Sequence, residues 1–424
     1  MIDRILAKGA DLCDEVEVFF TEGESVSAEL KRSIVGEAHA ARSWGIGIRT
    51  IRDGRIGASS TNDPSRWEDC LDAAIAGGTL ATPQEWHGLP GPVTLSGSVP
   101  VFDPNITVAI EPAREMLRGL LAGAASWPVD VIGGSAGLSR SSVAIANSAG
   151  VHYTSERTGV GVSLEAIAGT STGYEFDRSR FLDIDPFRVG EQAAFFAARS
   201  AGGGDIATGS YDVILSPVAV AQLLGNVLVP ALSGRNVHAG RSFLAGKLGE
   251  QVLGETISVV DDPFARGMGS TLFDAEGVPT RRLAFIEEGV LSSYAYDLRT
   301  AYRYSEKTTA SAVRGGAGGS PSIGIHNLLI EGPRHDIADE RAVYAHDLVG
   351  AHTANPVTGD FSVELSNAFW MEGGDYAEPI RKAMLAGNVF SMFGAVDGLG
   401  RESRVVGSMI LPPVRFKSMQ VIGT

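Results

Sequence analysis

The sequence predicts an α+β protein in which two N-terminal α/β modules of similar layout precede a large, mostly antiparallel β domain. The order helix, several strands, helix occurs twice in the first half, and strand-like runs dominate the second half. Stretches rich in Gly, Pro and Ser separate the parts. A sheet of so many strands buries a face by becoming barrel-like or strongly curved. The expected domains are residues 1–92, 105–204 and 207–424.

The first module is predicted from alternating strands and two helix signals. Residues 15–20 and 25–30 alternate between polar and apolar side chains, which is typical of strands with one face in water. Asp53-Gly54 predicts a tight hairpin, because Gly takes a positive φ without steric cost. Asp63-Pro64 predicts the start of a helix, since Asp accepts hydrogen bonds from free amides and Pro suits the first turn.

The second module repeats this order of elements without repeating the residues. A helix is predicted over 110–125, and short strands are predicted over 129–133, 137–141 and 159–168. Asp185-Pro186 then predicts the start of a closing helix. A repeated order of elements indicates internal duplication.

The third part opens with an apolar helix and continues into strands. Ser216-Pro217 predicts the helix start, and the apolar residues within 219–232 fall at helical spacing on one face. Gly234 is the expected end of this helix. Further along, Glu288-Gly289 is a turn signal between two strand-like runs and predicts a hairpin.

Composition indicates an acidic globular protein. Of 424 residues, 44% are hydrophobic and 20% are charged, with a net charge of −15. A nucleic-acid partner is not expected, because phosphate binding needs a basic surface. No apolar stretch approaches the ~20 residues that cross a bilayer, so no membrane partner is expected. Two cysteines, Cys13 and Cys70, and the lack of a signal-peptide pattern predict a cytoplasmic location.

The order of motifs in the third part resembles that of the TldD/PmbA family of metallopeptidases. The resemblance covers nearly the whole chain, although the first two segments match in layout only. Stretches that resemble family motifs follow the apolar helix in order. They are Ser242-Phe243-Leu244, Asp261-Asp262-Pro263, Phe273-Asp274-Ala275-Glu276-Gly277, Glu288-Gly289-Val290-Leu291, Gly359-Asp360-Phe361-Ser362 and the Ala-Gly-Asn-x-x-x-Met-Phe segment at 386–393.

The resemblance implies one of two kinds of subunit. TldD-type members hold zinc with a His-Glu-x-x-x-His helix and a later Cys-Gly-Lys segment, and PmbA-type members, also called TldE, lack this set. Here the corresponding helix contains residues 223–228, Leu-Leu-Gly-Asn-Val-Leu, and Gly398-Leu399-Gly400 stands near the expected Cys. A catalytic zinc needs three protein ligands. The resemblance therefore points to the PmbA type, with no cofactor in this chain and zinc only on a TldD-type partner.

Acidic residues of the third part are the candidates for chemistry. Asp274 and Glu276, with Asp261 and Asp262 upstream, have the side chains needed to hold a hard cation or to act as general acid and base. The alternative is that these carboxylates accept backbone amides at turns. The eight histidines show no His-x-x-x-His spacing. The sequence therefore identifies neither metal ligands nor peptide-binding residues.

By this resemblance we expect the zinc-free partner subunit of a peptidase that trims unfolded peptides. The family implies a chamber enclosed by a TldD-type and a PmbA-type subunit, with peptide bound in extended form as an added strand. Two alternatives remain open: an active metallopeptidase with unorthodox ligands, and a homodimeric peptide-binding protein without catalysis. A cluster of aromatic and Met side chains is expected at the subunit interface. It comprises Phe369, Trp370, Met371, Met384, Phe390, Met392 and Phe393.

Overall fold

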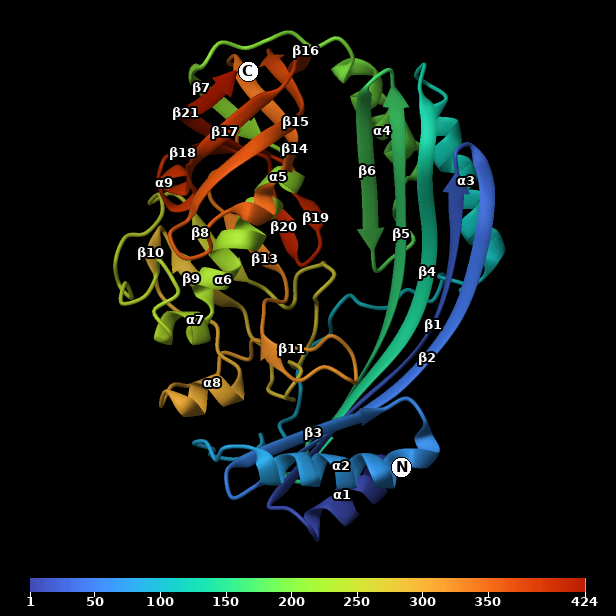
Figure 1. Ribbon diagram of the computed structural model, residues 1–424, viewed down its shortest axis with the longest axis vertical. Coiled ribbons are helices and arrows are strands. Elements are labelled where there is room, and N and C mark those ends of the chain that lie inside the picture. Colours follow the sequence, from blue (N-terminus) through green and yellow to red (C-terminus); the bar gives the residue numbers. More distant parts are fainter. Residues whose placement is uncertain (424) are drawn as a thin grey trace.

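The computed structural model describes residues 1–423 and contains two packed bodies (Figure 1). One is a long, curved six-stranded sheet that carries helices, and the other is a β-rich third unit formed by the chain from about residue 207 onward. The predicted α+β class, with a large and mostly antiparallel C-terminal part, is confirmed. Among residues 1–423, no helix is both long and apolar enough to cross a membrane.

The six-stranded sheet has the strand order β3-β2-β1-β4-β5-β6 and is antiparallel throughout. Each N-terminal segment contributes three consecutive strands, and the two sets join side by side through β1 and β4. The helix–three strands–helix order therefore occurs twice within one sheet. The strands are β1 (Glu15–Lys31), β2 (Ile34–Arg52), β3 (Arg55–Thr61), β4 (Asp130–Asn147), β5 (His152–Ala168) and β6 (Ser171–Ser179).

These strands are longer than the runs predicted from alternation. The runs predicted over 15–20 and 25–30 form one strand, β1, and those over 129–133 and 137–141 mostly belong to β4. Gly23 interrupts the pattern of β1 in the sequence but pairs with residues of both β2 and β4. The prediction of separate short strands is wrong because ladder partners on both sides hold the backbone extended.

Helices cover both ends of one face of this sheet. One helix pair packs over Val16 and Val18 of β1, and the other pair packs over Val26 and Ala28. All four residues point to the same face, because even spacing along a strand preserves direction. The first pair is α1 (Ile2–Ala10) and α2 (Trp67–Leu80), and the second is α3 (Ile110–Ala124) and α4 (Pro186–Ser200).

The predicted turn and helix-start signals are confirmed. Asp53 and Gly54 have φ values of 49° and 70° and turn the chain between β2 and β3. Asp63 accepts the amide hydrogen of Ser65 at 2.9 Å, where a short 3₁₀ turn leads into α2. Asp185 caps α4 in the same way.

The third unit contains a closed ring of five strands. Strands β14, β7, β21, β17 and β15 pair in this order, and pairing of β14 with β15 closes the ring. The expected barrel-like domain is therefore present, and closure removes the free edges of these strands. The ring and its attached strands are β7 (Gly209–Leu215), β14 (Ala342–Val349), β15 (Asp360–Glu372), β16 (Asp375–Ile380), β17 (Ala383–Asn388), β18 (Val396–Leu399) and β21 (Val414–Gly423).

A second sheet of the third unit has the order β10-β9-β8-β13-β20-β19. Its strands are β8 (Ser258–Asp261), β9 (Leu283–Glu287), β10 (Val290–Leu291), β13 (Leu328–Glu331), β19 (Arg404–Val406) and β20 (Met409–Leu411). Nearby are a two-stranded ladder and three short helices. These are β11 (Ala312–Val313), β12 (Ser322–Ile323), α7 (Gly234–His238), α8 (Leu298–Arg303) and α9 (Val389–Gly394).

The predicted apolar helix lies in the core of the third unit and contacts both sheets. Ser216 caps its start, as predicted, and accepts the amide hydrogens of Val218 and Ala219. The helix consists of α5 (Pro217–Leu223), a π-helical turn (Leu224–Leu228) and α6 (Val229–Leu232). Gly234 does not end it but begins α7. Glycine is required there because a Cβ would lie 2.1 Å from the Tyr296 ring.

The aromatic and Met cluster expected at a subunit interface lies mostly in the core of this chain. Five of its members are at most 6% exposed. The interface prediction is wrong for these five, because they fill the barrel and its contact with α4. They are Phe369, Met371, Phe390, Met392 and Phe393. Trp370 and Met384 are partly exposed, and their interface role stays a prediction.

Candidate functional site

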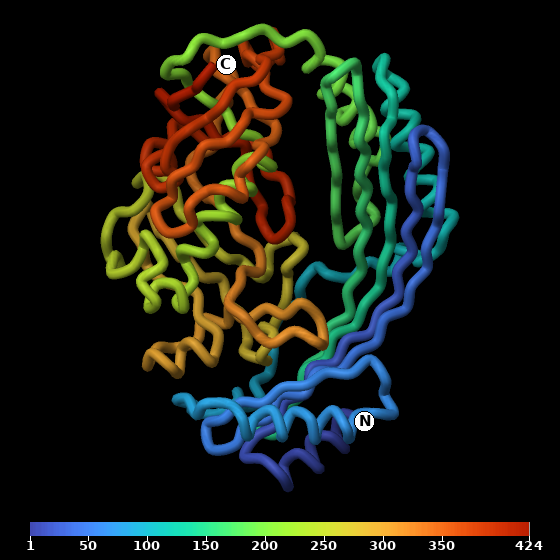
Figure 2. Tube along the Cα trace, in the orientation of Figure 1, coloured from blue at the N-terminus to red at the C-terminus, as the bar shows by residue number. Residues whose placement is uncertain are grey.

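At the lower end of the long strands, the third unit packs on the face of the sheet opposite the helices (Figure 2). Elsewhere its barrel contacts α4, and Arg404 pairs with Glu175 on the edge strand β6. Glu17 and Phe19 of β1 point to this face, because they alternate with Val16 and Val18. The glycine-rich loop 315–319 lies directly over Gly47 of β2, where a Cβ would be 2.1 Å from the carbonyl oxygen of Ala317. Glycine in β2 therefore permits this close approach.

Four charged side chains link the sheet to the third unit. Arg49 donates to Glu17 Oε2 and to Glu276 Oε1, both at 2.6 Å. Arg314 donates to the other oxygen of Glu17. The second oxygen of Glu276 accepts the amide hydrogen of Leu298 at 2.7 Å. Both carboxylates are fully buried, so this charge cluster (Glu17, Arg49, Glu276 and Arg314) is shielded from water.

Charge pairing and burial act on these carboxyl groups in opposite directions. For Glu17, burial alone would raise the pKa, but the guanidinium groups of Arg314 and Arg49 outweigh it and lower the pKa. For Glu276, burial raises the pKa and the charge of Arg49 only partly offsets it. Every carboxylate oxygen of the pair has a donor. Because no oxygen of Glu17 or Glu276 is free for catalysis, these two carboxylates serve as a structural link between the sheet and the third unit.

Asp274 lies two residues from Glu276 at a buried turn. Its Oδ1 atom accepts the amide hydrogens of Glu276 and Val278, both at 2.9 Å, and Oδ2 accepts that of Ala312 at 3.2 Å. Burial, followed by the charge of Glu276, raises the pKa of Asp274 to about 7. The two candidate carboxylates thus lie close together, in contacts that fit the turn alternative considered from the sequence.

The raised pKa of Asp274 gives a prediction for Asp274→Asn. The native state binds this proton more tightly than the unfolded chain does, so the contribution of Asp274 to stability falls as the pH rises from about 4 to about 7. The substitution should lower the free energy of unfolding by about 1 kcal/mol at pH 5, because the NH₂ group of Asn replaces one of the two accepting oxygens of Asp274. It should cost less at pH 8. Urea unfolding at both pH values measures this, with exposed Asp11→Asn as control. A cost that grows with pH would contradict it.

A cavity of about 310 Å³ lies beside Asp274, between the sheet and the third unit. Its walls combine apolar side chains with four ionisable ones. The apolar walls come from both bodies, with Phe19 and Val143 on the sheet and Phe273 and Ile325 on the third unit. The ionisable side chains at its lining are Arg157, Asp274, Arg314 and His326.

Asp261, at the end of β8, orients His326 at this cavity. The carboxylate of Asp261 accepts the amide hydrogens of His326 and Asn327, and its Oδ2 lies 3.0 Å from Nδ1 of His326. The other ring nitrogen, Nε2, is buried without a hydrogen-bond partner among residues 1–423. In the sequence, Asp261 belongs to the Asp-Asp-Pro motif, whereas nothing distinguishes His326 from the other seven histidines. The pairing joins residues 65 positions apart, which no local spacing could show.

Two arginines beside the cavity have no carboxylate partner in the part of the chain that the structure describes. Arg157 of β5 donates to the Thr271 hydroxyl at 3.3 Å, and its Nε has no partner. Arg180 donates to the carbonyl oxygens of Thr158 and Met268. Burial lowers the pKa of Arg157, and burial together with the charge of Arg157 lowers the pKa of Arg180 to about 10. This side of the cavity therefore holds uncompensated positive charge.

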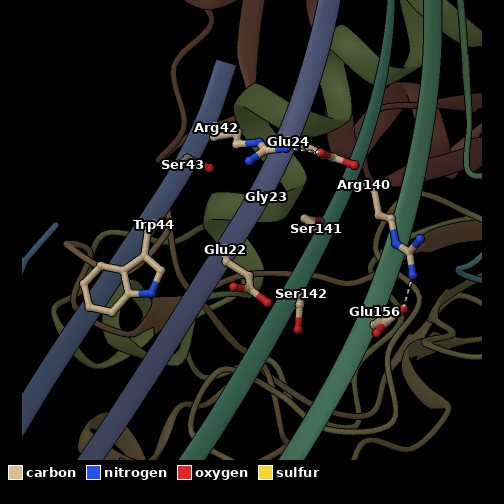
Figure 3. Close-up of a pocket in the computed structure, with 10 residues that line it drawn as sticks. All are labelled: Glu22, Gly23, Glu24, Arg42, Ser43, Trp44, Arg140, Ser141, Ser142 and Glu156. Carbon is tan, nitrogen blue, oxygen red and sulfur yellow. Dashed lines mark hydrogen bonds and ion pairs between the residues drawn. The ribbon is translucent and has the colours of Figure 1, made fainter. Parts of the chain in front are cut away.

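A second hollow, of about 490 Å³, lies on the helix-bearing face of the sheet (Figure 3). It occupies the middle of β1, β2, β4 and β5, between the two helix pairs. Arg140 pairs with Glu156 at 3.0 Å and Arg42 with Glu24 at 3.9 Å. These four charges form ion pairs within a hollow that is open to solvent, which is the usual arrangement of a polar surface.

The residues present do not fit a catalytic zinc ion. The π-helical turn Leu224–Leu228, at the place where the resemblance puts zinc ligands, has no His, Glu or Cys. Over residues 1–423, no group of three or more His, Cys, Asp or Glu is placed to hold a metal ion. A catalytic zinc needs three such ligands and an open position. The absence of a cofactor stays a prediction that metal analysis must test.

Comparison with known proteins covers nearly the whole chain. Models of the PmbA/TldA metallopeptidase family match residues 16–77 (domain 1), 102–201 (central domain) and 208–423 (C-terminal domain). An uncharacterized protein of Methanocaldococcus jannaschii is 30% identical over 98% of both chains. A metalloprotease of Methanothermobacter thermautotrophicus is 26% identical over 95% of this chain and 92% of its own.

A solved structure extends this similarity to the entire fold. The crystal structure of TldE from Thermococcus kodakarensis superposes with a TM-score of 0.92, at 27% identity and with 100% of each chain covered. The match includes the sheet, its helices and the third unit. The family models, the relatives and this fold together show that the chain belongs to the PmbA/TldD family of metallopeptidase-related proteins.

Proposed function

We propose that this chain is the zinc-free partner subunit of a cytoplasmic peptidase that trims unfolded peptides. One observation carries the proposal: the helical segment 217–232 has apolar and amide side chains where a TldD-type subunit would hold zinc. Leu224, Val227 and Leu228 are buried there, so the segment serves as core. Similarity to TldE over the full chain supports the same assignment.

In this role the chain would complete a chamber and present strand edges to the peptide. Strands β3 and β6 are the edges of the six-stranded sheet, and β16 attaches outside the closed ring. An extended peptide can pair with such an edge through main-chain hydrogen bonds, which tolerate varied side chains. The partner is a TldD-type subunit, and self-association would occur in its absence.

We expect the purified protein to carry no stoichiometric zinc and to cleave no peptide alone. Mixing it with a zinc-bearing TldD-type relative should produce cleavage of an unstructured peptide that neither chain shows alone. Elemental analysis after dialysis and a fluorogenic peptide assay measure the two results. The control is the same mixture with this chain heat-unfolded beforehand.

Other results would support the alternatives instead. About one zinc per chain, lost on replacing His238, His326 or His335, would indicate an active metallopeptidase with unorthodox ligands. A stable homodimer in light scattering that binds peptide but never stimulates the relative would indicate a binding protein without catalysis. A monomer that carries no zinc and never stimulates the TldD-type relative would contradict the partner-subunit proposal.

A further inference from the structure

We propose that the cavity between the sheet and the third unit binds the terminal carboxylate of a peptide, with Arg157 and His326 as its ligands. The anion site is inferred from the cavity itself, and the choice of a peptide as its source rests on the proposed function. The cavity is bounded by both bodies, so neither body alone makes it.

Arg157 supplies the fixed positive charge. Its side chain is largely buried, yet it has no carboxylate partner among residues 1–423, and its Nε atom donates to nothing. A buried charge without a partner is costly, so such arginines are usually paired. A guanidinium offers parallel N–H groups that match the two oxygens of a carboxylate. An incoming carboxylate would satisfy the donors that the chain leaves free.

His326 supplies the second contact. The residue is 6% exposed, its Nδ1 faces Asp261 at 3.0 Å, and its Nε2 has no partner. Buried polar atoms nearly always have a hydrogen-bond partner, and His326 lines the cavity, so its unpartnered Nε2 is a nitrogen that a ligand bound there can satisfy. A hydrogen on Nε2 can be donated to an anion, while Nδ1 stays directed at the carboxylate of Asp261.

The other charged groups at this cavity are already engaged. Asp261 and Asp274 accept backbone amides, which offsets their negative charge toward a ligand. Arg314 donates to Glu17 and to the carbonyl oxygen of Ala275. Arg157 and His326 are therefore the two ionisable side chains of this lining with polar atoms to spare.

The shape of the cavity favours the end of a peptide over a small inorganic ion. Its volume, about 310 Å³, lies at the lower limit of ligand pockets and suits one terminal residue. Phe19, Phe273 and Ile325 would contact an apolar side chain next to the carboxylate. A free phosphate would leave these apolar walls without contacts.

The test is calorimetric titration of the isolated chain with acetyl-Ala-Phe, its C-terminal amide and inorganic phosphate. The free acid should bind, and the amide should bind at least about tenfold more weakly, because a hydrogen bond to a charged group contributes about that factor. Arg157→Gln and His326→Gln should each weaken binding of the acid by about tenfold or more. Arg157→Lys keeps the positive charge but loses the paired N–H donors of the guanidinium, so this variant should bind the acid with intermediate affinity.

Matched controls are Arg140→Gln on the neighbouring strand and His152→Gln at the exposed start of β5, which should bind as the parent does. Thermal melting confirms that each variant is folded. Equal affinity for acid and amide, or unchanged binding in folded Arg157→Gln, would overturn the anion site. Phosphate binding as tight as that of the acid would overturn the peptide assignment. The zinc and stimulation assays test the proposed function separately, since this titration uses no partner.

Discussion

Replacing Arg49 by Met is expected to lower the free energy of unfolding by about 3–5 kcal/mol, the cost of breaking a buried ion pair by removing one partner. Arg49 donates to both Glu17 and Glu276, and both carboxylates are fully buried. Without the guanidinium, Glu276 keeps only the amide of Leu298 as its donor and Glu17 keeps only Arg314. Methionine preserves most of the side-chain volume, so the loss of stability measures the missing charge and not a new cavity.

Chemical unfolding followed by circular dichroism measures the effect, with Arg42→Met as the matched control. Arg42 is exposed and lies 3.9 Å from Glu24, so its loss should cost at most about 1 kcal/mol. The double variant Arg49→Met, Glu276→Gln should regain part of the stability, because residue 276 is then neutral and Glu17 keeps its ion pair with Arg314. Equal costs for Arg49→Met and Arg42→Met would show that the charge cluster does not hold the two bodies together.

The second large effect is expected from Gly190→Ala in α4, at about 1–3 kcal/mol of destabilisation. A Cβ at Gly190 would lie 2.0 Å from the carbonyl oxygen of Leu120 in α3. At Gly123, a Cβ would lie 1.9 Å from the carbonyl oxygen of Phe187. The two helices therefore approach with backbone against backbone, and one methyl group must push them apart.

Gly77→Ala provides the same substitution with the opposite expected sign. Gly77 is exposed in α2, and its Cβ would meet nothing within 4 Å. Alanine should therefore stabilise the protein by about 0.5–1 kcal/mol through helix propensity alone. Thermal melting of the two variants side by side measures the difference. Similar shifts of the same sign would show that the close approach of α3 and α4 does not determine the outcome.

Local chemistry made the turns and helix starts predictable. Asp53-Gly54, Asp63-Pro64, Ser216-Pro217 and Glu288-Gly289 all act as the sequence indicates, since each depends on a cap or a positive φ within a few residues. The motif order of the third part likewise identified the family.

Contacts between distant residues were not predictable. The length of β1 depends on ladders to β2 and β4, and the pairing of Asp261 with His326 joins two separate segments. Phe369 and Phe393 appeared suited to an interface, because hydrophobicity alone does not distinguish a buried core from a buried subunit contact. Arg157 carried no signal in the sequence, since its lack of an acidic partner is visible only in three dimensions.

The strand order of the closed ring has a consequence for how the protein is made. Strand β21 lies between β7 and β17 but follows both in the chain, so the ring cannot close until residues 414–423 have been synthesised. The six-stranded sheet is complete by Ser179 and can fold first, as N-terminal parts of nascent chains do. In such an intermediate, Glu17 and Arg49 are exposed to solvent until Glu276 and Arg314 of the third unit pack against them. This face of the early sheet thus carries two charged residues beside apolar ones such as Phe19, and the charges become a buried ion network only when the third unit packs against the sheet.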